Sequence, residues 1–376
     1  MNNRQRLNAI FNYENYDRMP VVHFGFWDEL LEKWAAEGHL KQEEIINAAD
    51  GSANEKIIEK KLGFDFNYYV TYQDKSGFSS LFPAFERKRL REFENGSYEC
   101  LNEDGMIVLM KTGTRSIPME IDHLLKDRAS WEEHYLPRLQ YSEDRFDNDI
   151  LQKLASESES RSEPLGIYCK SLFGQIRNWL GFEGISYLYA DDEDLYDEIV
   201  NTVGDLCYKT TKRALESGIK FDFAHFWEDI CFRNGPLVIP KVFSEKVGPH
   251  YRRICDLLKD YQINIVSLDC DGLIDSLVPV WMENGVNTMF PIEVGTWNGN
   301  IKPWREKYGK ELRGAGGMIK HVLSYDKAAV DAEIERLKPL VDLGGFIPCP
   351  DHRLAPETKW ELVQYYCDRM RTVFSN

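Results

Sequence analysis

The chain has 376 residues, of which 43% are hydrophobic and 13% aromatic, enough apolar material for a large core. Its 62 acidic residues outnumber 46 lysines and arginines, which gives a formal net charge of −16 at pH 7. This balance argues against nucleic acid and anionic membrane surfaces as the main partners, because both are bound by clustered positive charge. A local basic pocket for a small anion stays compatible with it.

The N-terminal segment is polar and lacks the apolar run of a secretory signal. No stretch approaches the roughly 18 to 20 apolar residues of a membrane span. The eight cysteines form no CxxC pair, and in a long chain without an export signal they are expected to be reduced thiols. The sequence therefore predicts a cytoplasmic protein without a membrane segment.

The first part of the chain alternates short helical and strand-like patterns. Residues 3–16 have helical apolar spacing, and the turn at 17–20 leads into a predicted strand at 21–26. Residues 28–36 form an amphipathic pattern, and residues 64–71 alternate weakly as a strand would.

Residues 83–115 have a different character. Two turn signals, Asn95-Gly96 and Asp104-Gly105, separate strand-like runs, which predicts a meander of antiparallel hairpins inserted at the edge of the fold. Such an insertion could cover a cleft or mediate formation of a homodimer. Residues 123–160 are polar, charged and helical in pattern, and we expect them to form an exposed connection.

From about residue 164 strand-like segments alternate with helical ones, a pattern typical of right-handed βαβ crossovers and a parallel sheet. The segments are 165–170, 221–226, 264–268, 286–291, 312–319 and 345–348. With 21–26 and 64–71 they make eight strands, which favours a closed α/β (β/α)8 barrel spanning 1–376 as one domain. One strand fewer would allow a doubly wound sheet instead.

In such barrels the chemistry lies where strands end. Four of the eight histidines fall at these ends, together with acids, thiols and lysines. In chain order the residues are His23, Cys169, Lys170, Ser171, His225, Glu228, Asp229, Asp269, Cys270, Asp271, Glu293, Lys320, His321, Cys349, Asp351 and His352.

The central segment is NIVSLDCDG at residues 264–272, a buried strand pattern that ends in two acids around a thiol. Side chains alternate along a strand, so Asp269 and Asp271 are expected on one side, while Cys270 is expected in the wall. Two close carboxylates either raise one pKa or share a cation. Alternatively, Asp271-Gly272 simply forms a turn and caps the next helix.

A zinc ion is one candidate occupant, because cysteine, histidine and carboxylate all bind zinc. The candidate ligands are Asp269, Asp271 and His352, with Cys349, Cys270 or Glu293 as substitutes. The tight spacings HExxH and paired CxxC are absent, so the same groups can instead serve as acid and base without a metal.

Over nearly its whole length the chain resembles the uroporphyrinogen decarboxylase superfamily. The similar motifs, in order, are RQRLNAIFNYENYDRMPVVHFGFWDE, SLFGQIRNWLGFEG, HFWEDICFRNGPLVIPKVFSEKVGPHYRRI, DCDGLIDSLVPVWMENGVNTMFPIE and GGFIPCPDHRLAPETKWELVQYY. The resemblance implies a (β/α)8 barrel with an open cleft at the carboxyl ends of the strands.

The resemblance implies two chemistries. True decarboxylases of this superfamily carry a PVWxMRQAGR-like segment, but PVVHFGFWDELLEKW here has acids and no arginine. The methyltransferase branch holds zinc through an HxC motif and a later cysteine. At the matching positions this chain has Asp269, Asp271 and, in CPDHRLAP, His352.

The leading hypothesis is a methyltransferase that works with a corrinoid protein or a methylated small molecule. Asp269, Asp271 and His352 would form its centre, beside Glu293 and His225. The substrate-binding candidates are His23, Ser171, Glu228 and Asp229, and Lys320, which would orient an anionic group. The alternatives are a decarboxylase of a carboxylated substrate, tetrapyrroles included, and a non-catalytic ligand-binding barrel.

Overall fold

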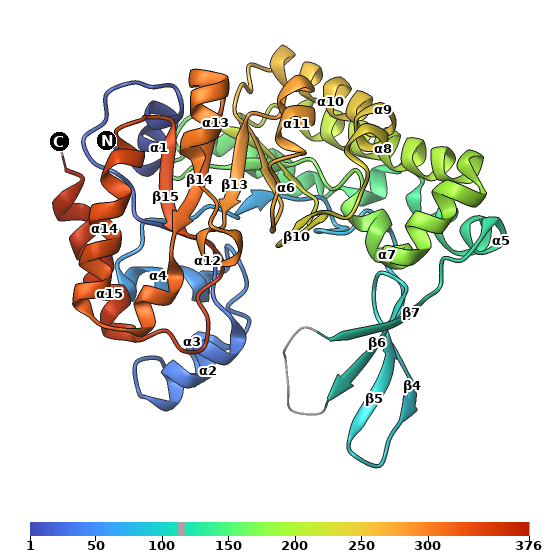
Figure 1. Ribbon diagram of the computed structural model, residues 1–376, viewed down its shortest axis with the longest axis horizontal. Helices are drawn as coiled ribbons and strands as arrows, with labels where there is room; N and C mark the ends of the chain where they lie inside the picture. The colour runs from blue at the N-terminus through green and yellow to red at the C-terminus, as the bar shows by residue number, and fades with distance from the viewer. Residues whose placement is uncertain (112–117, 376) are drawn as a thin grey trace.

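The computed structural model describes residues 1–111 and 118–375. Its core is a parallel seven-stranded sheet in the order β15-β14-β13-β12-β9-β8-β3 (Figure 1). The strands are β15 (Phe346–Pro350), β14 (Arg313–Met318), β13 (Thr288–Ile292), β12 (Val266–Asp269), β9 (Phe223–Trp227), β8 (Gly166–Tyr168) and β3 (Thr71–Tyr72).

A short parallel pair beside this sheet completes the ring. β1 (Val22–His23) pairs with β2 (Phe66–Asn67), which leads directly into β3. On its other side, the segment after β1 bonds to the segment after β15: the Leu354 amide donates to the Gly25 carbonyl at 3.1 Å, and the Trp27 amide donates to the Leu354 carbonyl at 3.1 Å. The predicted (β/α)8 barrel and its eight strand positions are confirmed.

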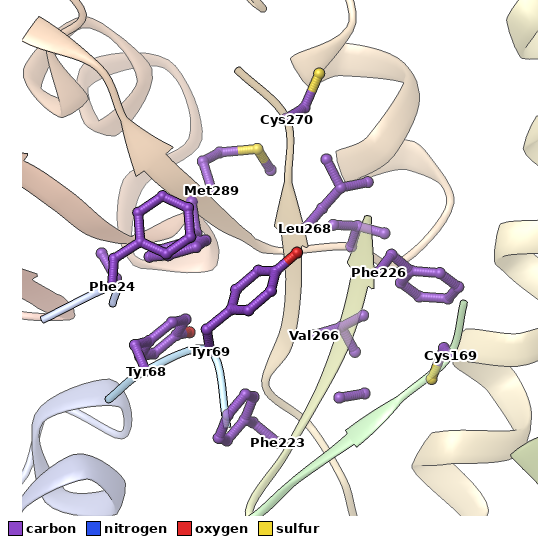
Figure 2. Close-up of a cluster of buried hydrophobic side chains, with 14 of the residues drawn as sticks. Phe24, Tyr68, Tyr69, Cys169, Phe223, Phe226, Val266, Leu268, Cys270 and Met289 are labelled. Carbon is purple, nitrogen blue, oxygen red and sulfur yellow. The ribbon is translucent and has the colours of Figure 1, made fainter. Parts of the chain in front are cut away.

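Aromatic rings fill the interior of the barrel. Tyr68 packs against Phe290 at 4.8 Å and against Phe223 at 5.3 Å between ring centroids, and Phe24 packs on Phe290 at 4.7 Å. Phe24, Tyr68 and Tyr69 lie together on one side of β12, and Phe226 lies on the other (Figure 2). Within β9, alternation of side chains turns Phe223 and His225 toward these rings and Phe226 toward Tyr251.

Helices surround the ring and connect its strands (Figure 1). They are α1 (Asn3–Phe11), α2 (Asp28–Ala36), α3 (Gln42–Ile45), α4 (Ala53–Leu62), α5 (Arg128–Ser130), α6 (Asn148–Glu157), α7 (Gly174–Asp191), α8 (Glu193–Leu215), α9 (Pro240–Lys246), α10 (Gly248–Asp260), α11 (Val278–Glu283), α12 (Val294–Trp297), α13 (Ile301–Tyr308), α14 (Lys327–Val341) and α15 (Trp360–Val373). Shorter η turns cover 131–135, 136–139, 143–145, 309–311 and 320–324.

Helix α1 ends earlier than the predicted 3–16. Asn12 caps it with non-helical backbone angles, and Tyr13 takes the left-handed conformation with φ at 59°. That conformation reverses the chain, and a non-glycine residue adopts it only when its surroundings hold it there. Within the described residues, no helix has the length and apolar character needed to cross a bilayer.

The predicted hairpin insertion is a separate antiparallel sheet that stands away from the barrel (Figure 1). Its strands are β4 (Lys88–Glu92), β5 (Ser97–Leu101), β6 (Met106–Lys111) and β7 (Met119–His123). The sheet extends past the predicted boundary at 115, and positions 112–115 of the prediction lie outside the described residues. A small hairpin, β10 (Cys231–Phe232) with β11 (Gly235–Pro236), follows β9.

Candidate active site

Three carboxylates converge where β9 and β12 end. Asp229, Asp269 and Asp271 each offer an oxygen within 4.8 Å of the others. Asp269 is the last residue of β12, and the two-residue period returns Asp271 to the same side. Asp229 reaches them because its backbone is left-handed, with φ at 49°, and its Oδ1 accepts a hydrogen bond from the Asp271 amide at 3.0 Å.

Crowding and burial keep these three groups from ionising together. Burial, followed by the charges of Asp229 and Asp271, raises the pKa of Asp269 well above its ordinary value, although a hydrogen bond from Tyr69 opposes this. Burial and the charge of Asp271 raise the pKa of Asp229 to about 7. Like charges this close either keep a proton or attract a cation, so the cluster is a seat for positive charge.

His352 extends the cluster toward solvent. Its Nε2 lies 3.3 Å from Asp271 Oδ2, and its ring stacks on Trp27 with centroids 5.8 Å apart and planes at 12°. Phe24 lies 5.4 Å from the same imidazole. In the part of the chain that the structure describes, Asp271 Oδ1 and His352 Nδ1 are enclosed yet have no hydrogen-bond partner. Such enclosed, unpaired atoms are uncommon in proteins and require an explanation.

A second pair of carboxylates lies beside His352. Asp351 accepts hydrogen bonds from the backbone amides of Val294, Gly295 and Lys320, at 3.0, 2.8 and 3.1 Å. It thereby ties together the loops after β13, β14 and β15. Glu293 accepts from the Gly272 amide at 2.6 Å, and burial, then the charge of Asp271, raises its pKa.

These groups surround a pocket of about 270 Å³. Its walls are Trp27, Asp271, Glu293, Gly295, Thr296, Lys320, His321, Asp351 and His352. Burial lowers the pKa of Lys320, and its ammonium donates to the Arg353 carbonyl at 3.3 Å. The Arg353 guanidinium itself is bound by Asp50, with one contact at 3.0 Å. The pocket therefore has more negative than positive side chains.

The structure places the other predicted site residues elsewhere. His225 lies in the barrel interior among Tyr68, Tyr69 and Phe290, and burial lowers its pKa to about 3, so the imidazole is neutral. Its ring nitrogens have no hydrogen-bond partner among the described residues. His23 is fully buried and meets Glu59 at 2.7 Å, at a second cluster on β1 and α4.

Ser171 and Glu228 have structural partners in place of the predicted substrate contacts. The buried Glu228 carboxylate accepts hydrogen bonds from the Ser171 hydroxyl, the Tyr251 hydroxyl and the backbone amides of residues 172–174. These bonds occupy free backbone amides at the start of α7, where a negatively charged acceptor is stabilising. Glu228 points away from Asp229, its neighbour in sequence, which is directed into the acid cluster.

The substitute thiol ligands do not reach the site. Cys270 and Cys349 are fully buried, and burial raises the pKa of both thiols. Figure 2 shows Cys270 directed away from the aromatic interior. Neither thiol belongs to a group of converging ligand atoms in the described chain, and His352 binds one carboxylate without joining the trio. A zinc–thiolate centre does not fit this donor set, because all-carboxylate sites suit harder cations.

Two contributors to the site, Trp27 and Tyr69, carry no predicted role in the sequence, and Asp351 is predicted only as a strand-end residue. Trp27 stands at the start of an amphipathic helical pattern, Asp351 stands at a strand end, and Tyr69 belongs to a weakly alternating strand pattern. For Asp351 the position after β15 is a usable signal. For Trp27 and Tyr69 nothing local distinguishes an aromatic wall of a pocket from ordinary core.

No protein-family model and no curated protein matches the chain. Among solved structures it is similar to a methyltransferase from Methanosarcina mazei, at 14% identity over 99% of both chains with a TM-score of 0.63. It also matches a putative vitamin-B12 independent methionine synthase from Listeria monocytogenes, at 9% identity over 96% of this chain and 98% of the other, with a TM-score of 0.44. The first likeness establishes that the whole chain has the barrel fold of a methyltransferase structure.

Proposed function

We propose that this protein is a methyltransferase, similar to the non-decarboxylase branch of the uroporphyrinogen decarboxylase superfamily, that acts with a corrinoid protein or a methylated small molecule. The observation that carries the proposal is the Asp271–His352 pair at 3.3 Å, opening into a pocket at the carboxyl ends of the strands. The full-length likeness to a methyltransferase structure supports it.

Asp271 and His352 take the roles of orienting group and base. A proton on Nε2 directed at Asp271 leaves Nδ1, which has no protein partner in the described chain, to accept a proton from the group that receives the methyl. Asp229 and Asp269 stabilise positive charge beside this pair. A corrinoid bound to a partner protein would supply the methyl-carrying centre, and the proposed roles of these side chains require no zinc.

Decarboxylation of a carboxylated substrate is the second candidate. It would need positive side chains to hold the substrate carboxylates, but Asp271, Glu293 and Asp351 line the pocket and Arg353 is bound by Asp50. The pocket also lies below the roughly 300–1,000 Å³ usual for ligand sites, which disfavours a tetrapyrrole. A non-catalytic barrel is the outcome if no methyl transfer is found.

The test is a methyl-transfer assay with methylcobalamin and a panel of thiol and amine acceptors, on protein of measured metal content. Asp271→Asn and His352→Gln should abolish transfer. The matched control is Asp368→Asn, the same substitution at an exposed position on α15. Equal turnover in all four proteins, or none in any, would overturn the proposal.

A further inference from the structure

Acidic side chains in the lining of this pocket are fixed in position by hydrogen bonds. Asp351 accepts three backbone amides, and Glu293 accepts the Gly272 amide and the Thr296 hydroxyl, at 2.6 and 2.8 Å. These backbone donors belong to the loops after β12, β13 and β14 and hold the two carboxylates in place. With Lys320 as the one cationic side chain in the lining, an anionic ligand would meet net repulsion.

An aromatic wall stands opposite these charges. Trp27 lines the pocket, the His352 ring is stacked on it, and Phe24 lies behind that imidazole at 5.4 Å. Metal ions are bound by carboxylates with water or imidazole and gain nothing from an indole. Aromatic faces combined with carboxylates are instead the surroundings that recognise quaternary ammonium groups, which have no N–H to donate.

Asp271 and His352 are reachable from the pocket, because their side chains are 33% and 23% exposed. Asp271 Oδ1 and His352 Nδ1 are both shielded from solvent without a partner among the described residues, and both side chains border the pocket. One belongs to a carboxylate and the other to an imidazole ring. A small ligand with a cationic head and one polar substituent complements these two side chains.

We infer that the methyl donor is a small quaternary ammonium compound, held with its charged nitrogen between Asp271 and the Trp27 wall. This inference rests on the proposed function and names its substrate class. The donor class also explains the missing thiolate ligands. When a nucleophile attacks the methyl carbon, the C–N bond breaks and its electron pair stays on nitrogen, so the amine leaves neutral without a Lewis acid or a proton.

The nucleophile supplies the electron pair for the new bond to the methyl carbon. By chemical class it is the reduced centre of a corrinoid partner or a thiolate, as the proposed function requires. A neutral amine, ether or thioether donor would need activation of its leaving group, for which the described site offers no thiolate-held metal. The departing amine is neutral when the C–N bond breaks and takes up a proton from water afterwards.

The experiment is calorimetric titration at pH 8 with choline and with 3,3-dimethylbutan-1-ol, the neutral compound in which carbon replaces the charged nitrogen. We expect choline to bind at least about tenfold more tightly, since a desolvated cation–aromatic contact with a nearby carboxylate supplies about that factor. Trp27→Leu and Asp271→Asn should each weaken choline binding about tenfold, whereas Trp27→Phe and Asp368→Asn should stay within about threefold.

Thermal unfolding of each variant identifies any that fail to fold, and Trp27→Phe keeps the wall testable if Trp27→Leu does not fold. Equal affinity for the two compounds, or no binding of choline, would overturn the inference. So would a Mg²⁺ or Zn²⁺ titration in which the metal binds at Asp271 and choline does not. Because binding is measured without turnover, methyl transfer from neutral donors with no choline binding would remove this inference and leave the proposed function standing.

Discussion

Two clusters of converging side chains in this barrel, one of a histidine with two glutamates and one of three aspartates, differ in their hydrogen bonding. His23, Glu55 and Glu59 have ligand atoms within 4.8 Å of one another, and so do Asp229, Asp269 and Asp271. The convergence of ligand atoms therefore does not distinguish them. The difference lies in what else each group contacts.

In the first cluster the side chains have protein partners. His23 Nε2 meets Glu59 at 2.7 Å, and its Nδ1 accepts from the Gly25 amide at 2.9 Å. Glu55 accepts from the Asn67 side chain at 2.8 Å and from the Gly51 amide at 2.5 Å. Asn67 also donates to Asp50, which binds Arg353 beside His352. Through Asp50 and Arg353, this network connects β1 and β2 at the start of the barrel to the segment after β15.

In the second cluster the bonding is incomplete. Asp271 Oδ1 and, next to it, His352 Nδ1 have no partner in the described chain. An enclosed polar atom without a partner costs about 1–3 kcal/mol, which proteins retain at sites of function more readily than in scaffold. Between these two clusters, incomplete hydrogen bonding, more than acid content, distinguishes the second.

The largest effect is expected from a substitution in the second cluster. Asp271→Asn should lower kcat/KM for methyl transfer about 10²- to 10⁴-fold, because the base loses its orienting charge. Its thermal midpoint should stay the same or rise, since the change relieves repulsion with Asp229 and Asp269. Steady-state kinetics and calorimetry on the same sample check both halves. A variant that loses stability but keeps activity would reverse the assignment of the two clusters.

The next largest effect is expected from a substitution in the first cluster. Glu59→Leu leaves His23 Nε2 buried without a partner and should lower the free energy of unfolding by about 1–3 kcal/mol, with kcat/KM unchanged. Urea denaturation measures the loss. Glu59→Gln, which keeps an acceptor for His23, should recover most of it. Loss of activity at unchanged stability would mean that this cluster is functional too.

A smaller effect is a pH dependence of stability that comes from the second cluster. The pKa of Asp229 is about 7 in the folded protein, above its ordinary value, so the folded state binds this proton more tightly than the unfolded chain does. The stability that the bound proton contributes is present below pH 4 and is lost as pH rises toward 7. Asp229→Asn should reduce that fall by about 1 kcal/mol between pH 6 and 7 in urea denaturation. An unchanged slope would show that Asp229 does not hold the proton.

The smallest effect defines the baseline of the comparison. Lys220 and Glu159 form an ion pair in which both side chains are mostly exposed. Glu159→Ala should leave the urea midpoint and the activity unchanged, because water replaces the partner. A clear destabilisation there would mean that the loss in Glu59→Leu cannot be assigned to burial.

The sequence was sufficient to predict the barrel, but it was insufficient to predict which cluster has complete hydrogen bonding. Alternating segments predicted the strands, because the parallel sheet and its surrounding helices impose periods of 2 and 3.6 on the chain. The same pattern placed Asp269 and Asp271 together. It could not show that His23 finds Glu59 on α4, or that Glu228 finds Tyr251, because those partners are distant in sequence.

Asp229 shows a second limit of prediction from sequence, which is the local backbone conformation. Its neighbour Glu228 follows the same strand and has the same chemistry, yet one carboxylate joins the acid cluster and the other anchors α7. The left-handed backbone at Asp229 turns its side chain in a different direction from that of Glu228. No local residue pattern predicts this conformation. Strand ends predict where polar groups gather, but partner geometry decides which of them remain available for a substrate.

Gly272 limits which residues of this pocket can be changed. With φ at 86°, its position would place a Cβ 2.6 Å from the Cys231 carbonyl oxygen, so the loop with Asp271 lies directly against the β10–β11 hairpin. A library that varies residue 272 would therefore yield misfolded loops in place of new specificities. Thr296 lines the same pocket but donates to Glu293 at 2.8 Å, whereas Trp27 meets the site through its stack on His352. Position 27 is therefore where a change of substrate range can be selected with the hydrogen bonds of the acids kept.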